Sequence, residues 1–114
     1  MTRIAEGGPF VVLIEFEIAP EQQLAFLHEI ADRVHTHFNL YPGFVSSSFH
    51  ASSDGQQIIN YTQWRTEADW EQSLASPRRM EVQEEIEAIM SRHGAMPVRV
   101  LPLRVVKVIT EAAT

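Results

Sequence analysis

The stretch SSDGQQIINYTQWRTEADW, residues 52–70, decides the fold of this chain. Asp54-Gly55 lies between two runs rich in apolar, β-branched and aromatic residues, the first from Phe44 to Ala51 and the second ending near Arg65. Asp-Gly between two such runs is the strongest short-range signal of a β-hairpin. The sequence therefore predicts two neighbouring antiparallel strands joined by a tight turn.

The second of these strands mixes apolar and polar side chains on one face. Because side chains alternate along a strand, Ile58, Asn60, Thr62 and Trp64 point to the same side of the sheet. Two interpretations follow. The face belongs to an ordinary core strand whose polar groups find partners, or it forms the wall of an apolar pocket that orients a flat molecule.

The chain before the hairpin predicts a strand and a helix. Residues 10–18 are β-branched and aromatic, and apolar residues alternate with Glu in their second half. Pro20 suits the first position of a helix over about 20–38. The expected buried stripe of that helix consists of Leu24, Leu27, Ala31, Val34 and Phe38. Pro42-Gly43 then predicts a turn.

After the hairpin, the sequence predicts a helical region and a last strand. Thr66 is a suitable helix cap, and Ser76-Pro77 restarts the helix, which is expected to end near His93-Gly94. The last strand is expected over 98–109, and Pro102 within it requires an edge position, a bulge or a bend. Residues 1–8 and 111–114 are expected to be loose ends.

The order strand, helix, strand, strand, helix, strand predicts an α+β ferredoxin-like split βαβ fold (βαββαβ). Its four-stranded antiparallel sheet carries helices on one face. The 114 residues form one domain, with an ordered core of about 10–109. The uncovered sheet face would be apolar, so a face-to-face homodimer is expected.

Composition excludes several function classes. The chain has no cysteine, which excludes disulfides, thiolate metal sites and a catalytic thiol and suits a cytoplasmic location. A formal charge of −6 argues against nucleic acid as a partner. No apolar run approaches the ~20 residues of a membrane span, and no signal peptide is expected at the N-terminus.

The histidines offer two sites to weigh. His28, Asp32 and His35 share one face of the first predicted helix, where they form either a solvated polar face or a metal site. His50 either joins a pocket or caps the hairpin. Glycine-rich phosphate loops and nucleophile elbows are absent, so no nucleotide, flavin or serine chemistry is predicted.

Asn60 is the most informative polar residue. An unpaired buried carboxamide costs roughly 1–3 kcal/mol, so Asn60 requires a partner. Backbone, water or a substrate could each supply that partner, and a purely structural Asn60 and Trp64 stay open as alternatives.

Three segments, YPGFVSSSFHASSDG from Tyr41, INYTQW from Ile59 and Ser76-Pro77-Arg78, resemble the antibiotic biosynthesis monooxygenase family. The resemblance covers about residues 10–109 and is strongest to cofactor-independent anthrone oxygenases of aromatic polyketide pathways. It implies a dimeric α+β barrel with a pocket between sheet and helices, no metal or flavin, and molecular oxygen as co-substrate. Asn60 and Trp64 match the catalytic residues of such enzymes. Substrate contacts are expected from Trp70, His50, Thr62 and Ile58.

The implied reaction is oxidation of an anthrone or related electron-rich phenolic ring to a quinone. Some relatives place a Tyr and an Arg in the second helix, where this chain has Trp70 and Gln83, so a phenol-to-Arg relay is not expected. The residues that haem-degrading relatives use are also missing. Two other functions stay open, an aromatic polyketide cyclase and a non-enzymatic ligand-binding dimer of the same fold.

Overall fold

A computed structural model describes residues 9–112. Its elements follow the predicted order, with the second helical region divided in two. They are β1 (Phe10–Glu17), a 3₁₀ turn η1 (Pro20–Gln22), α1 (Gln23–Phe38), β2 (Phe44–Ala51), β3 (Gln57–Trp64), α2 (Glu67–Ala75), α3 (Pro77–His93) and β4 (Met96–Arg104).

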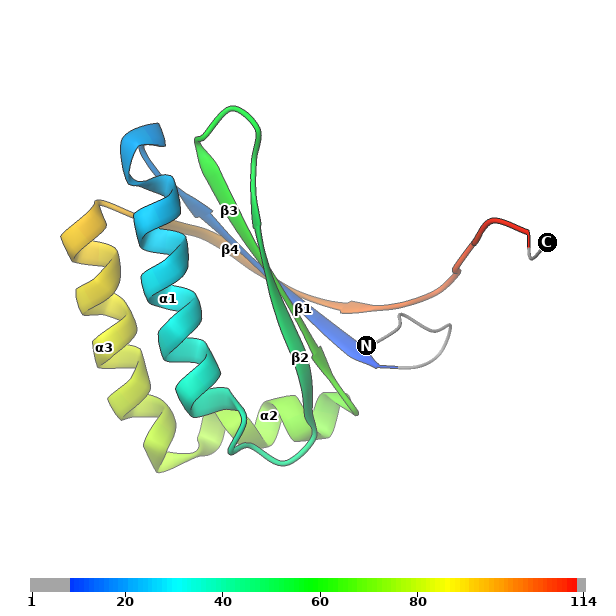
Figure 1. Ribbon diagram of the computed structural model, residues 1–114. Helices are drawn as coiled ribbons and strands as arrows, with labels where there is room; N and C mark the ends of the chain where they lie inside the picture. The colour runs from blue at the N-terminus through cyan, green and yellow to red at the C-terminus, as the bar shows by residue number, and fades with distance from the viewer. Residues whose placement is uncertain (1–8, 113–114) are drawn as a thin grey trace.

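The four strands form one antiparallel sheet in the order β2-β3-β1-β4. The helices lie on one face of this sheet, with α1 and α3 side by side and α2 across one end (Figure 1). The α+β ferredoxin-like prediction is therefore confirmed. Within residues 9–112, no helix is long and apolar enough to cross a membrane.

The last strand differs in extent from the prediction. It runs from Met96 to Arg104 instead of 98–109, and the chain beyond Arg104 leaves the sheet as an extended segment (Figure 1). β4 is an edge strand, as Pro102 requires. Its pairing with β1 also shifts register between Glu15 and Phe16.

The buried face of α1 agrees with the predicted stripe at Val34 and Phe38 and differs from it in the first half of the helix. The residues it buries are Gln23, Phe26, Ile30, Val34 and Phe38, whereas Leu24 is 61% exposed. The prediction for Leu24 was wrong because Phe26 and Ile30, on an overlapping stripe of the same helix, pack into the core instead, which turns Leu24 toward solvent. The amide of Gln23 bonds the Ser52 and Gln57 carbonyls and so ties α1 to the hairpin.

Local signals set the other boundaries as expected. Thr66 caps α2 by accepting a hydrogen bond from the Asp69 N–H at 3.1 Å. Gly94 ends α3 in the left-handed conformation at φ 70°. Gly43 also has a positive φ, 82°, and a Cβ there would meet the side chain of Asp69. The turn before β2 therefore requires glycine.

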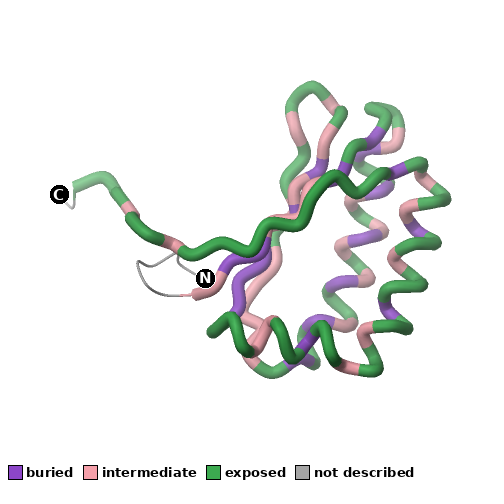
Figure 2. Tube along the Cα trace, turned by 180° about the vertical axis from the view of Figure 1, so that it is seen from behind, coloured by how far each residue is buried: buried purple, intermediate pink, exposed green. Residues whose placement is uncertain are grey.

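Burial concentrates between the sheet and the helices, while β4 is exposed along its whole length (Figure 2). The opposite sheet face has no helix. By strand register, Leu13 of β1 lies between Tyr61 and Leu101 on that face, and Val11 lies between Gln63 and Leu103. We call these six residues the open face, because no helix covers them, although Val11 and Gln63 are themselves buried.

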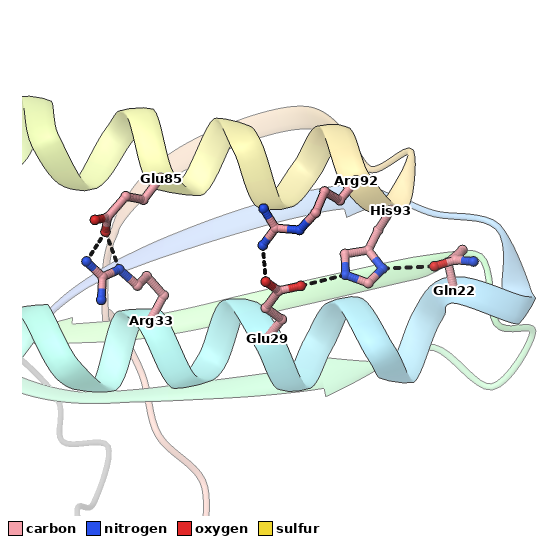
Figure 3. A network of polar contacts seen from close by, with 6 residues as sticks. All are labelled: Gln22, Glu29, Arg33, Glu85, Arg92 and His93. Atoms are coloured by element: carbon pink, nitrogen blue, oxygen red, sulfur yellow. Dashed lines mark hydrogen bonds and ion pairs between the residues drawn. The ribbon is translucent and has the colours of Figure 1, made fainter.

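Polar side chains link α1 to α3 (Figure 3). His93 bridges Gln22 and Glu29 with contacts of 2.8 Å each, and Arg92 donates to the other oxygen of Glu29. Arg33, which follows Glu29 by one turn of α1, forms an ion pair with Glu85 of α3. The hydrogen bonds from His93, and then from Arg92, hold the pKa of Glu29 below its usual value of 4.5.

The lowered pKa predicts how this network contributes to stability. A carboxyl whose pKa is depressed by folding stabilises the fold above its unfolded pKa, and that contribution disappears as pH falls through the folded pKa. We expect Glu29→Gln to lower the melting temperature at pH 7. The difference from wild type should shrink below about pH 4.5. Thermal unfolding, followed by circular dichroism at several pH values, measures this difference in melting temperature.

Glu84→Gln is the matched control, because Glu84 is exposed on α3 with no hydrogen bond or ion pair among the described residues. It should leave the melting temperature nearly unchanged across the same range. A Glu29→Gln effect of equal size at pH 7 and pH 3 would contradict an electrostatic origin.

Candidate active site

A cavity of about 430 Å³ lies between the helix-facing side of the sheet and the helices. Cavities of roughly 300–1,000 Å³ are typical of small-molecule sites. Its lining is mainly apolar, and the exceptions are Asn60, Arg79, Gln83 and the indole of Trp70. The partly or largely exposed Leu74, Met80 and Val100 also line it, so the cavity opens to the surface where these side chains lie.

Asn60 lies in this cavity with its amide held in one orientation. It is 4% exposed, and its Oδ1 accepts hydrogen bonds from Ser47 Oγ at 2.7 Å and from Thr62 Oγ1 at 3.0 Å. Ser47 and Thr62 are register partners on β2 and β3, which brings both hydroxyls to the same oxygen. The amide nitrogen has no hydrogen-bond partner among residues 9–112. Its N–H groups are therefore available to a bound ligand.

The two tryptophans have different places. Trp70, on α2, lines the cavity and stacks at a tilt on Phe10, with ring centroids 5.5 Å apart. Trp64 is 1% exposed and does not line the cavity. It packs against Phe38, Tyr41 and Phe44, with ring centroids 5.6–6.4 Å away. Since Phe38 is a lining residue, Trp64 supports the wall from behind.

The remaining candidates lie around the cavity or away from it. Thr62 contacts Asn60, as described, and Ile58 is completely buried in the core next to it. His50 is exposed and contacts Ser48 at 3.0 Å. Because His50 pairs with Ile59, it lies on the sheet face away from the helices. The structure thus places Asn60 and Trp70 in the cavity lining. Thr62, Ile58 and His50 do not line it, and Thr62 acts on the cavity only through its hydrogen bond to Asn60.

The sequence interpretation missed Arg79. It lines the cavity from the first turn of α3, and its guanidinium carbon lies 4.7 Å from the centre of the Phe38 ring. Burial lowers its pKa, while the nearby Tyr41 hydroxyl acts in the opposite direction. Arginine stays charged at neutral pH even so. Arg78-Arg79 was visible only as a basic pair, and helical phase could have separated the exposed Arg78 from the inward Arg79.

The metal alternative gains no support from geometry. His28, Asp32 and His35 are all exposed on α1. Among the described residues, no three His, Cys, Asp or Glu side chains form a group that could hold a metal ion.

Comparison with known proteins identifies relatives over most of the chain. The family model of the antibiotic biosynthesis monooxygenases matches residues 9–85, which run from β1 into α3. Tetracenomycin-F1 monooxygenase of Streptomyces glaucescens is 41% identical over 69 residues, 60% of this chain. The matched part spans only 62% of that relative's length.

Solved structures give the same fold. A monooxygenase from the gene ActVA-Orf6 of Streptomyces coelicolor, in complex with nanaomycin D, has a TM-score of 0.71 at 27% identity. The alignment covers 92% of this chain and 94% of that one. SnoaB, a cofactor-independent oxygenase from Streptomyces nogalater, has a TM-score of 0.66 at 16% identity and 91% and 99% coverage. The family model matches more than half of the residues of this chain, so the chain belongs to the antibiotic biosynthesis monooxygenase family.

Proposed function

We propose that this protein is a cofactor-independent monooxygenase that oxidises an anthrone or a related electron-rich phenolic ring to a quinone with O2. The single observation that carries this proposal is Asn60, whose amide donors face an apolar cavity while its oxygen is held by two hydroxyls. The relatives named as monooxygenases support the reaction class. The nanaomycin D bound to the Streptomyces coelicolor relative supports a small organic ligand.

In the proposed reaction the substrate supplies its own electrons. Loss of a proton from the ring methylene gives a delocalised carbanion whose negative charge rests mainly on oxygen. The Asn60 N–H groups would stabilise this oxyanion in a site with little water. The carbanion passes one electron to O2, and the two radicals combine into a peroxide. Loss of water then leaves the quinone, with one oxygen atom in the product and the other in water.

The other site residues take supporting roles in this proposal. Trp70 forms a flat wall for the ring system. Thr62, together with Ser47, keeps the Asn60 amide turned toward the ligand. Trp64 holds the aromatic wall in place, and a direct contact with substrate would require a rearrangement of Phe38. The cytoplasmic location expected from composition stays a prediction.

Oxygen uptake with dithranol as substrate tests the function. We expect uptake that is unaffected by a metal chelator and quinone formation that stops under anaerobic conditions. Asn60→Ala should lower kcat by about 10²–10³, the usual cost of removing one oxyanion donor. Asn39→Ala, at the exposed end of α1, is the matched control and should retain full activity.

Other outcomes would redirect the assignment. Inhibition by the chelator would count against a cofactor-free reaction. Turnover of a poly-β-ketone analogue without oxygen uptake would favour cyclisation. Binding of aromatic ligands without turnover, unchanged by Asn60→Ala, would favour a ligand-binding dimer.

A second copy of the chain is the partner we propose for the open face. The face has an apolar centre of leucines and Tyr61, and Leu101 and Leu103 are 37% and 40% exposed. Next to it on the same side of the sheet, Glu15 and Arg99 neutralise each other in an ion pair. A twofold axis would place this patch against itself without opposing like charges. The dimeric barrel implied by the sequence resemblance supports the same arrangement.

This homodimer predicts that a charge on the open face produces monomers. Leu101→Glu should convert a dimer into a folded monomer, because it would bury two carboxylates in the interface. Light scattering after size-exclusion chromatography measures the mass. Leu40→Glu, at an exposed leucine in the turn after α1, is the control and should remain dimeric. A monomeric wild-type protein would overturn the proposal.

A further inference from the structure

The cavity is lined by a positive charge, Arg79, that no carboxylate within residues 9–112 neutralises. Arg79 forms no ion pair with a carboxylate among the described residues, although several other arginines do. Its Nη1 is inaccessible to solvent and has no hydrogen-bond partner within that part of the chain. Arg79 as a whole is half-buried and lines the apolar cavity, so its charge is partly desolvated. A partly desolvated charge without a counter-ion costs stability, so a compensating anion is expected.

Neighbouring side chains orient Arg79 without neutralising it. The guanidinium lies over the Phe38 ring, a cation–π contact that favours this position of the side chain. The Tyr41 hydroxyl is close enough to influence it but is itself buried without a hydrogen-bond partner. A neutral hydroxyl and an aromatic ring cannot supply the negative charge. The arrangement leaves a pre-oriented cation at the wall of an apolar cavity.

We propose that Arg79 is the anion-binding residue of the cavity and that the natural ligand is a flat aromatic molecule bearing a carboxylate or an ionised phenol. This proposal deepens the function proposed above and rests on it for the identity of the site. The guanidinium fork suits a planar pair of oxygens, and a charge-assisted hydrogen bond inside a dry cavity is stronger than one in water.

Two polar anchors then hold the ligand. Arg79 reaches the cavity from α3, whereas Asn60 reaches it from the sheet. An aromatic ligand whose acidic group meets Arg79 would have its position along the cavity restricted. Arg79 would thus select substrates by charge, and Asn60 would act on the reacting ring.

Binding of 2-naphthoate and of its neutral isostere 2-naphthamide tests the proposal without any turnover. Isothermal titration at pH 7, in the absence of substrate, measures both dissociation constants. We expect wild-type protein to bind the carboxylate at least about tenfold more tightly. Arg79→Met should abolish this preference while leaving the affinity for the amide unchanged. Arg79→Lys, which keeps the charge without the fork, should retain part of it.

Arg78→Met is the matched control, since Arg78 is the exposed neighbour and does not line this cavity. It should preserve the full preference. Equal wild-type affinities for the two probes, no binding of either probe, or a preference that survives Arg79→Met would overturn the proposal. If Arg79→Met does not fold, the wild-type comparison and Arg79→Lys decide.

The two proposals can fail separately. Charge preference with no oxygen uptake would sink the oxygenase function and leave the anion site in place. Oxygen uptake with no charge preference would overturn the anion site and leave the oxygenase function in place.

Discussion

The register of β3 between β1 and β2 is the constraint on which the site depends. It pairs Asn60 with Ile14 on one side and Phe49 on the other, and it pairs Thr62 with Ser47. Side chains alternate along a strand, so a slip of one residue would turn Asn60 to the open face and remove it from both hydroxyls. The Asp54-Gly55 hairpin and the apolar helix-facing residues maintain this register together.

The cavity combines two polar groups whose environments differ in kind. Asn60 is half satisfied: its oxygen has two donors, and only its N–H groups remain for a ligand. Arg79 is oriented by Phe38 but lacks a negative partner. An unpartnered polar group costs stability, and under our proposals an oxygen-bearing ligand in the cavity would recover part of that free energy. Unpartnered polar groups of this kind are expected at functional sites, where local rules of stability are relaxed.

Several features could be predicted because their causes are local. The hairpin, the Thr66 cap, the restart at Pro77 and the stop at Gly94 each depend on a few adjacent residues. The incorrect predictions concern features that depend on residues far apart in the sequence. Leu24 was placed in the core because the helix carries two overlapping apolar stripes, and only packing against the sheet selects the one with Phe26 and Ile30. The last strand was predicted too long because its β-rich composition does not show where pairing stops. The neighbouring strand β1 begins at Phe10, opposite Arg104, so β4 ends there.

The sequence by itself determined the order of elements, the antiparallel hairpin and the shared face of Ile58, Asn60, Thr62 and Trp64, since turn chemistry and strand alternation are local properties. Only the tertiary structure decided which of these side chains reach the cavity. Phe38 at the end of α1, together with Tyr41 and Phe44, covers Trp64, whereas Asn60 lines the cavity. Ser47 and Arg79 come from β2 and α3, and only packing across the sheet and between layers brings them to the same cavity as Asn60.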